Sequence, residues 1–193
     1  MKSAQLYSTL LRNKLCVATT KDIYRMIENK GYARLFIHRL IKNGFMERVV
    51  KGVYALKDAT ILSVASLSSY PSYISCVSAL SLLEKSDVVS IRIDVATLKN
   101  KRKVRFRGTE LNFLKIRKNG FWGFEKKQDE TGCPYYMAVP EKAFLDAVYF
   151  NTAPTSYLMD IFEQLDAKKL KEYAKRWNSR KLIKRLKECG FYG

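Results

Sequence analysis

The chain has 193 residues and a formal net charge of +18 at pH 7, with a sequence pI near 9.8. Hydrophobic residues make up 47% of it, which excludes a disordered basic tail and allows one large domain or two small ones. Such an excess of Lys and Arg favours a polyanionic partner, and nucleic acid is the first candidate.

The positive charge is concentrated at the two ends of the chain. Residues 1–57 contain 12 Lys and Arg against 3 Asp and Glu, and residues 161–193 contain 10 against 4. The expected nucleic-acid surface therefore includes the N-terminal part. We interpret the basic residues of the C-terminal helices first as solvent-exposed side chains, and their contact with DNA stays open.

Cysteine and histidine usage limits the possible chemistry. The four cysteines lie far apart, no CxxC pair occurs, and His38 is the only histidine. We therefore expect no metal site, no cofactor and no Ser-His-Asp arrangement, and no P-loop or GxGxxG motif is present. Because these catalytic motifs are absent, we expect a protein that is not an enzyme. Free thiols and a start without an apolar signal segment predict a cytoplasmic location.

Residues 60–83 contain no charged side chain and are numerous enough to cross a bilayer. Eight serines and a central Pro71 argue instead for two short buried helices, because hydroxyl groups and a helix breaker are poorly suited to a membrane span. We expect no membrane partner.

The N-terminal pattern predicts three helices. The first covers about 3–13. The second starts at a Thr19 or Thr20 cap, with Asp22 in its first turn, and ends at a turn in which Gly31 adopts the left-handed conformation. The third covers about 32–43 and ends at Gly44.

The third helix has two distinct faces. The apolar face comprises Phe36, Ile37, Leu40 and Ile41. Arg34, His38 and Lys42 lie on the opposite face, with Arg39 beside them. Arginine can bond a guanine edge with two hydrogen bonds, and lysine can hold phosphates, as a recognition helix requires. A solvated basic face is the alternative interpretation.

Two β-prone runs, 45–50 and 53–56, flank Lys51-Gly52 and predict a hairpin. Helix, turn, basic helix and hairpin is the order of a winged helix-turn-helix, a module that inserts one helix into the DNA major groove. Arg48 and Lys51 lie where such a wing meets DNA, although turn chemistry alone would explain Lys51 equally well.

We therefore expect an α+β protein with a winged helix-turn-helix DNA-binding domain over 1–57 and a mixed α/β domain over 58–193. The residues expected to contact DNA are Thr20, Lys21, Arg34, His38, Arg39, Lys42, Arg48 and Lys51.

The sequence pattern of residues 58–193 predicts both helices and strands. The expected strands are 88–95, a hairpin of 104–107 and 111–116, 121–124, and 135–139. The expected helices are two within 60–85, one from Pro140, one over 155–164, and one over 168–188 with a break near 177–179. A metal-dependent nuclease using Asp94, Glu110 and Lys115 is an alternative function of a different class.

Three passages, 44–56, 72–80 and 138–146, resemble in order and spacing the AbiEi antitoxin family. Their shared features are a Gly-x-Tyr-x-Leu wing end, a Ser-Tyr-Ile-Ser…Ser-Ala-Leu segment and a Pro-Glu-Lys-Ala helix start. The resemblance implies an autorepressor that binds operator repeats of its own operon. It also implies a type IV antitoxin that counteracts a nucleotidyltransferase toxin without a stable complex. A stand-alone winged-helix transcriptional regulator is the alternative. The Pro140-Glu141-Lys142 passage is interpreted first as a structural helix start.

Overall fold

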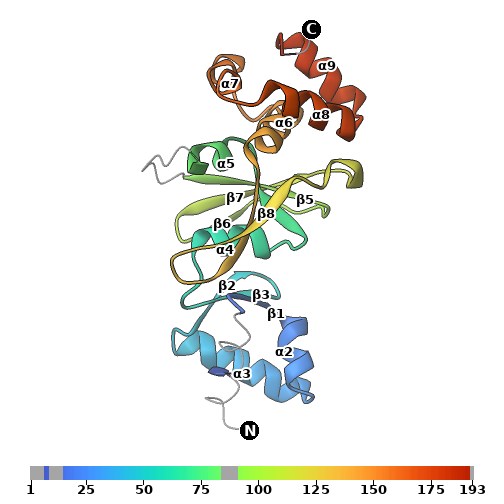
Figure 1. The fold of residues 1–193 in the computed structure, drawn as a ribbon. Coiled ribbons are helices and arrows are strands. Elements are labelled where there is room, and N and C mark those ends of the chain that lie inside the picture. Colours follow the sequence, from blue (N-terminus) through green and yellow to red (C-terminus); the bar gives the residue numbers. More distant parts are fainter. Residues whose placement is uncertain (1–6, 9–14, 84–90, 192–193) are drawn as a thin grey trace.

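The structure is a computed structural model of the 193-residue chain, and it describes residues 7–8, 15–83 and 91–191. Its elements form an α+β fold with two sheets. Figure 1 shows α2 and α3 at one end, the larger sheet in the middle, and the C-terminal helices at the other end. The helix expected over 3–13 falls mostly outside the described residues.

The N-terminal part contains two helices and a three-stranded antiparallel sheet of order β1-β3-β2. Its elements are β1 (Val17–Thr19), α2 (Thr20–Met26), α3 (Lys30–Lys42), β2 (Met46–Val50) and β3 (Val53–Leu56). The second and third predicted helices and the hairpin are confirmed as elements, whereas β1 was not predicted. Buried side chains such as Ile23, Phe36 and Leu56 pack the two helices onto this sheet.

Side-chain caps fix where the two helices begin. The Thr19 side chain accepts from the Asp22 backbone, and Asp22 accepts in return from the Thr19 backbone, forming a capping box. Asn29 caps α3 by accepting from the Tyr32 backbone at 2.9 Å. The left-handed conformation predicted for Gly31 is wrong, because this cap places Gly31 inside the first turn of α3. Gly44, with φ +72°, follows the end of α3 as predicted.

The second part is built on a mixed six-stranded sheet of order β6-β7-β5-β4-β9-β8. The strands are β4 (Ser72–Ile74), β5 (Arg92–Thr97), β6 (Val104–Phe106), β7 (Thr109–Lys115), β8 (Phe124–Gln128) and β9 (Pro134–Ala138). The helices are α4 (Ile61–Leu67), α5 (Cys76–Leu83), α6 (Pro140–Phe150), α7 (Thr155–Phe162), α8 (Ala167–Trp177) and α9 (Arg180–Glu188).

Two predictions for this part need correction. The break near Tyr70-Pro71 is followed by β4, a strand in the interior of the sheet, before α5 begins. The strand expected over 121–124 is wrong: residues 118–120 form a 3-10 turn, and β8 starts only at Phe124. Gly123 has φ +72°, and a Cβ on Gly120 would lie 2.5 Å from the Trp177 ring, so this segment bends closely around Trp177.

One hydrophobic core crosses the boundary expected at residue 57. Val17, Val49 and Ala55 belong to the same buried cluster as the residues of the six-stranded sheet. Arg107, in the β6–β7 turn, reaches Glu47 of β2 with an N–O distance of 2.6 Å and also donates to the Ala59 carbonyl at 2.8 Å. The N-terminal part is therefore packed against the second part. Within the described ranges, no helix is sufficiently long and apolar to cross a bilayer.

Cys16 and Cys133 form a disulfide across this boundary, which corrects the expectation of four free thiols. Cys16 precedes β1 and Cys133 precedes β9, and packing of the two parts brings their Cα atoms within 5.8 Å despite a separation of 117 residues. Cys76 and Cys189 remain free. Since disulfides are rare in cytosolic proteins, a cytoplasmic location stays a prediction that the cysteines no longer support.

Removing this disulfide should lower the free energy of unfolding by about 2–4 kcal/mol, because it closes a long loop in the unfolded chain. Urea unfolding of wild type with and without reductant, and of Cys16→Ser, measures the effect. Cys189→Ser is the control and should unfold like wild type. Identical curves for oxidised and reduced protein, with no Cys16–Cys133 peptide found by mass spectrometry, would contradict the link.

A fully buried ion pair lies where β4 meets α6. Lys142 and Asp146, four residues apart on α6, form a hydrogen-bonded ion pair with no solvent exposure. Asp146 also accepts from the Ser75 hydroxyl at 2.6 Å and the Tyr73 hydroxyl at 3.0 Å. Burial lowers the pKa of Lys142, which the Asp146 carboxylate opposes; burial likewise raises the pKa of Asp146, which Lys142 opposes.

Lys142→Ala should destabilise the protein by about 3–5 kcal/mol, because it leaves the Asp146 carboxyl buried without its cation. The exposed Lys184–Glu188 pair has the same four-residue spacing and supplies the control. Lys184→Ala should lower the free energy of unfolding by about 0.5 kcal/mol or less. Urea unfolding monitored by tryptophan fluorescence gives both values, and equal losses for the two variants would contradict the assigned role of the buried pair.

Candidate nucleic-acid interface

A hollow of about 910 Å³ lies between α3, the start of α2 and the β2–β3 hairpin. Six of the eight residues predicted to contact DNA line it: Thr20, Arg34, His38, Lys42, Arg48 and Lys51. They come from three separate elements, and no carboxylate is among the lining residues. The packing of these elements thus gathers the predicted residues along one concave basic surface.

Backbone contacts determine how the hairpin turn sits against α2. The Thr20 N–H donates to the Gly52 carbonyl at 2.9 Å, which holds the turn at the helix start. Gly52 has φ +80°, a conformation that favours glycine, and a Cβ there would lie 3.4 Å from the Thr20 hydroxyl. Lys51, at the tip of the turn, is therefore presented from a fixed position beside α2.

Two tyrosines position the arginines of the hollow. The Arg34 Nε donates to the Tyr24 hydroxyl at 3.4 Å, and the Arg48 guanidinium carbon lies 5.9 Å from the centre of the Tyr54 ring. Within the described chain, neither arginine forms a salt bridge, and neither does Lys42 or Lys51. Because no carboxylate neutralises them, these cations are available to an anionic partner.

The remaining two predicted residues lie outside the hollow. Lys21 lines a separate cleft next to α2. Arg39 is exposed in the last turn of α3 and does not line the hollow. Sequence reasoning did not single out Tyr24, and it noted Tyr54 only as the tyrosine of the Gly-x-Tyr-x-Leu wing end. The available signal for a role of Tyr54 beside Arg48 was that the two residues face each other across the predicted hairpin.

The carboxylates proposed for a nuclease are engaged with other partners. Asp94 is buried and accepts from Arg92 at 2.9 Å and from Asn112 at 2.7 Å, and Glu110 pairs with Lys103 at 2.9 Å. Lys115 lies five residues after Glu110 on β7, about 17 Å along an extended strand. Among the described residues, no group of three or more His, Cys, Asp or Glu side chains is placed to hold a metal ion.

Comparisons with known proteins address the fold only. No protein-family model matches the chain, and no curated protein matches it. The crystal structure of the RV2827C protein from Mycobacterium tuberculosis is similar, with a TM-score of 0.52 and 15% sequence identity over 97% of this chain and 77% of that protein. At this identity, the similarity shows that the two chains share a fold and says nothing about their functions.

Proposed function

We propose that residues 15–57 are a winged helix-turn-helix that binds double-stranded DNA and represses transcription. The observation that carries the proposal is the carboxylate-free hollow, lined by basic residues of α3 and of the β2–β3 hairpin. In this arrangement α3 is the recognition helix, and the hairpin is the wing.

The two groups of residues have different roles in this proposal. Arg34, on the exposed side of α3, reads base edges in the major groove, and its weak bond to Tyr24 limits the directions it samples. Arg48 and Lys51 contact the phosphate backbone, which fixes the register of the protein without reading sequence. Buried Phe36 and Leu40 hold the opposite side of α3 against the sheet.

We further propose that the chain represses its own operon and acts as the antitoxin of a type IV system, counteracting a nucleotidyltransferase toxin. Support comes from the ordered resemblance of 44–56, 72–80 and 138–146 to the AbiEi antitoxin family. Two of these passages contain the buried Lys142–Asp146 pair and its partners Tyr73 and Ser75. The need to bury and satisfy this pair in the fold also explains why these two passages resemble those of the family.

Co-expression separates the antitoxin from a stand-alone transcriptional regulator. If a nucleotidyltransferase gene adjoins this one and arrests growth when expressed, the wild-type chain should restore growth when supplied from an unrelated promoter. Restoration by an Arg34→Ala variant as well would assign neutralisation to a surface other than α3. Failure of the wild type to restore growth would leave a regulator without antitoxin activity.

Arg34→Ala should weaken binding to the chain's own upstream DNA by about 1–3 kcal/mol, because it removes a base contact in the major groove. Electrophoretic mobility shifts on upstream and scrambled duplexes give both affinities. Arg39→Ala changes the same helix outside the hollow, so it should weaken binding to the upstream DNA less than Arg34→Ala does. If Arg34→Ala binds the upstream DNA as tightly as wild type, α3 is not the recognition helix.

Lys51→Ala should weaken binding to every duplex by a similar factor and reduce the slope of log affinity against log salt by about 1, because one phosphate contact is lost. Fluorescence anisotropy across a salt series measures the slope. Lys57→Ala removes an exposed lysine outside the hollow and should leave the slope unchanged. Equal slopes for wild type and Lys51→Ala would remove the wing tip from the interface.

A further inference from the structure

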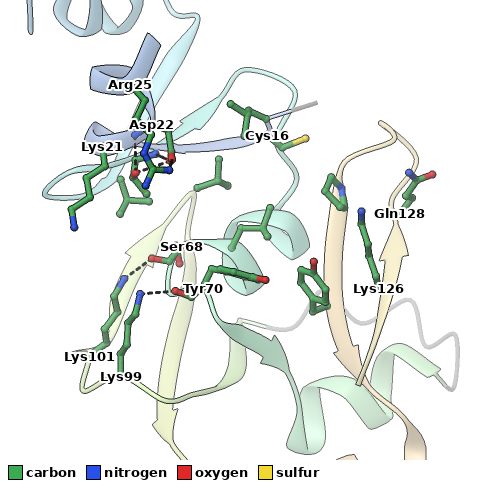
Figure 2. A pocket seen from close by; sticks show the side chains of 17 residues that line it. Cys16, Lys21, Asp22, Arg25, Ser68, Tyr70, Lys99, Lys101, Lys126 and Gln128 are labelled. Atoms are coloured by element: carbon green, nitrogen blue, oxygen red, sulfur yellow. Dashed lines mark hydrogen bonds and ion pairs between the residues drawn. The ribbon is translucent and has the colours of Figure 1, made fainter. Parts of the chain in front are cut away.

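A second concave surface, a cleft of about 790 Å³, lies on the other side of α2 from the DNA-binding hollow. One wall belongs to β1 and α2, and the other walls come from the end of α4, the β5–β6 connection and the β8–β9 hairpin. Figure 2 shows Lys99 and Lys101 together on one side of Tyr70, with Lys126 on the other side. The cleft thus joins residues from both parts of the chain.

The cleft is strongly basic. Five cationic side chains line it: Lys21, Arg25, Lys99, Lys101 and Lys126. The one lining carboxylate, Asp22, is occupied in capping α2 and lies 3.8 Å from Arg25. Across the part of the chain that the structure describes, none of the four lysines forms a salt bridge. An anionic ligand would neutralise charge that the cleft itself leaves unbalanced.

Backbone carbonyls hold two of these lysines in place. The Lys99 ammonium donates to the Tyr70 carbonyl at 2.5 Å, and the Lys101 ammonium donates to the Ser68 carbonyl at 2.5 Å. Partial burial and the neighbouring Lys99 lower the pKa of Lys101. Neutral carbonyl groups therefore hold the two lysine ammonium groups near each other. A phosphate bound between them would relieve their mutual repulsion.

The cleft also offers an aromatic surface. Tyr70 is 56% exposed, and its ring centre lies 5.8 Å from that of Tyr136. A nucleobase can stack on such a ring whatever its identity. The volume of the cleft falls within the range of small-ligand sites.

We propose that this cleft binds a nucleotide carrying two or three phosphates. The phosphate chain lies against Lys99, Lys101 and Lys126, and the base stacks on Tyr70. Lys21 and Arg25 belong to α2, so a bound nucleotide bridges the DNA-binding part and the second part of the chain. The proposal concerns a site separate from the DNA-binding hollow and does not depend on DNA binding.

Isothermal titration of the full chain at about 0.15 M salt tests the proposal, since this ionic strength screens weak surface attraction. The probes are ATP, GTP, CTP, UTP, adenosine and inorganic tripolyphosphate. We expect saturable binding of at least one triphosphate at one per chain, weaker binding of tripolyphosphate, and none of adenosine. If no nucleoside triphosphate binds, or if tripolyphosphate binds as tightly as every nucleotide, the proposal is overturned.

A charge-matched pair of variants locates the site. Lys99→Ala/Lys126→Ala removes two cations of the cleft, whereas Arg102→Ala/Lys127→Ala removes two cations that lie near them in sequence but outside the lining. The first should weaken triphosphate binding at least about tenfold, and the second by less than about twofold. Equal losses in the two would show attraction by net charge alone and would overturn the assignment.

A Tyr70→Ala variant separates the base from the phosphates. It should weaken binding of the nucleoside triphosphate while leaving the affinity for tripolyphosphate unchanged, because only the nucleotide has a base to stack. Thermal melting of each variant verifies folding, and Lys99, Lys126 and Tyr70 are all exposed, so loss of the fold is not expected. Unchanged nucleotide affinity in Tyr70→Ala would overturn the stacking role.

Discussion

The arrangement of the second part depends on one buried ion pair. Lys142 and Asp146 are removed from water on α6, a costly step that their mutual attraction and the hydroxyls of Tyr73 and Ser75 offset. Because the two hydroxyls come from β4 and its end, the pair fixes α6 against the middle of the sheet, where β4 runs parallel to β9. A one-residue shift of β4 would turn the Tyr73 hydroxyl away from Asp146 and leave the carboxylate unsatisfied.

The sheet in turn supports the N-terminal part. Three features cross between them: the shared hydrophobic core, the Cys16–Cys133 disulfide and the contact of Arg107 with Glu47. All three lie on the side of the three-stranded sheet away from the exposed face of α3. The basic hollow is therefore left open, while the elements that form it are held in place. Thr20 lines this hollow, and its neighbour Lys21 lines the cleft on the other side of α2.

Sequence patterns predicted the elements that local signals define. Thr19, Gly44 and Lys51-Gly52 mark helix and hairpin ends through caps and turns, and the alternation of cationic and apolar residues gave the two faces of α3.

Features that depend on distant residues were missed. Strand β4 has three residues, all buried, so it shows no alternation of polar and apolar side chains. The disulfide joins residues 117 positions apart. The Lys142–Asp146 pair did have a signal, opposite charges at four-residue spacing beside the apolar Ala143 and Ala147, but only packing shows that it is buried.

The most direct test of the account is a titration of the wild-type protein onto its own upstream DNA and onto a scrambled duplex of equal composition, at two salt concentrations. If α3 reads sequence while the wing holds phosphates, the upstream duplex should bind more tightly at both concentrations, and the preference should persist as added salt weakens both complexes. Equal affinity for the two duplexes, with the same salt dependence, would reduce the hollow to a nonspecific basic surface and contradict the proposal of a sequence-specific repressor.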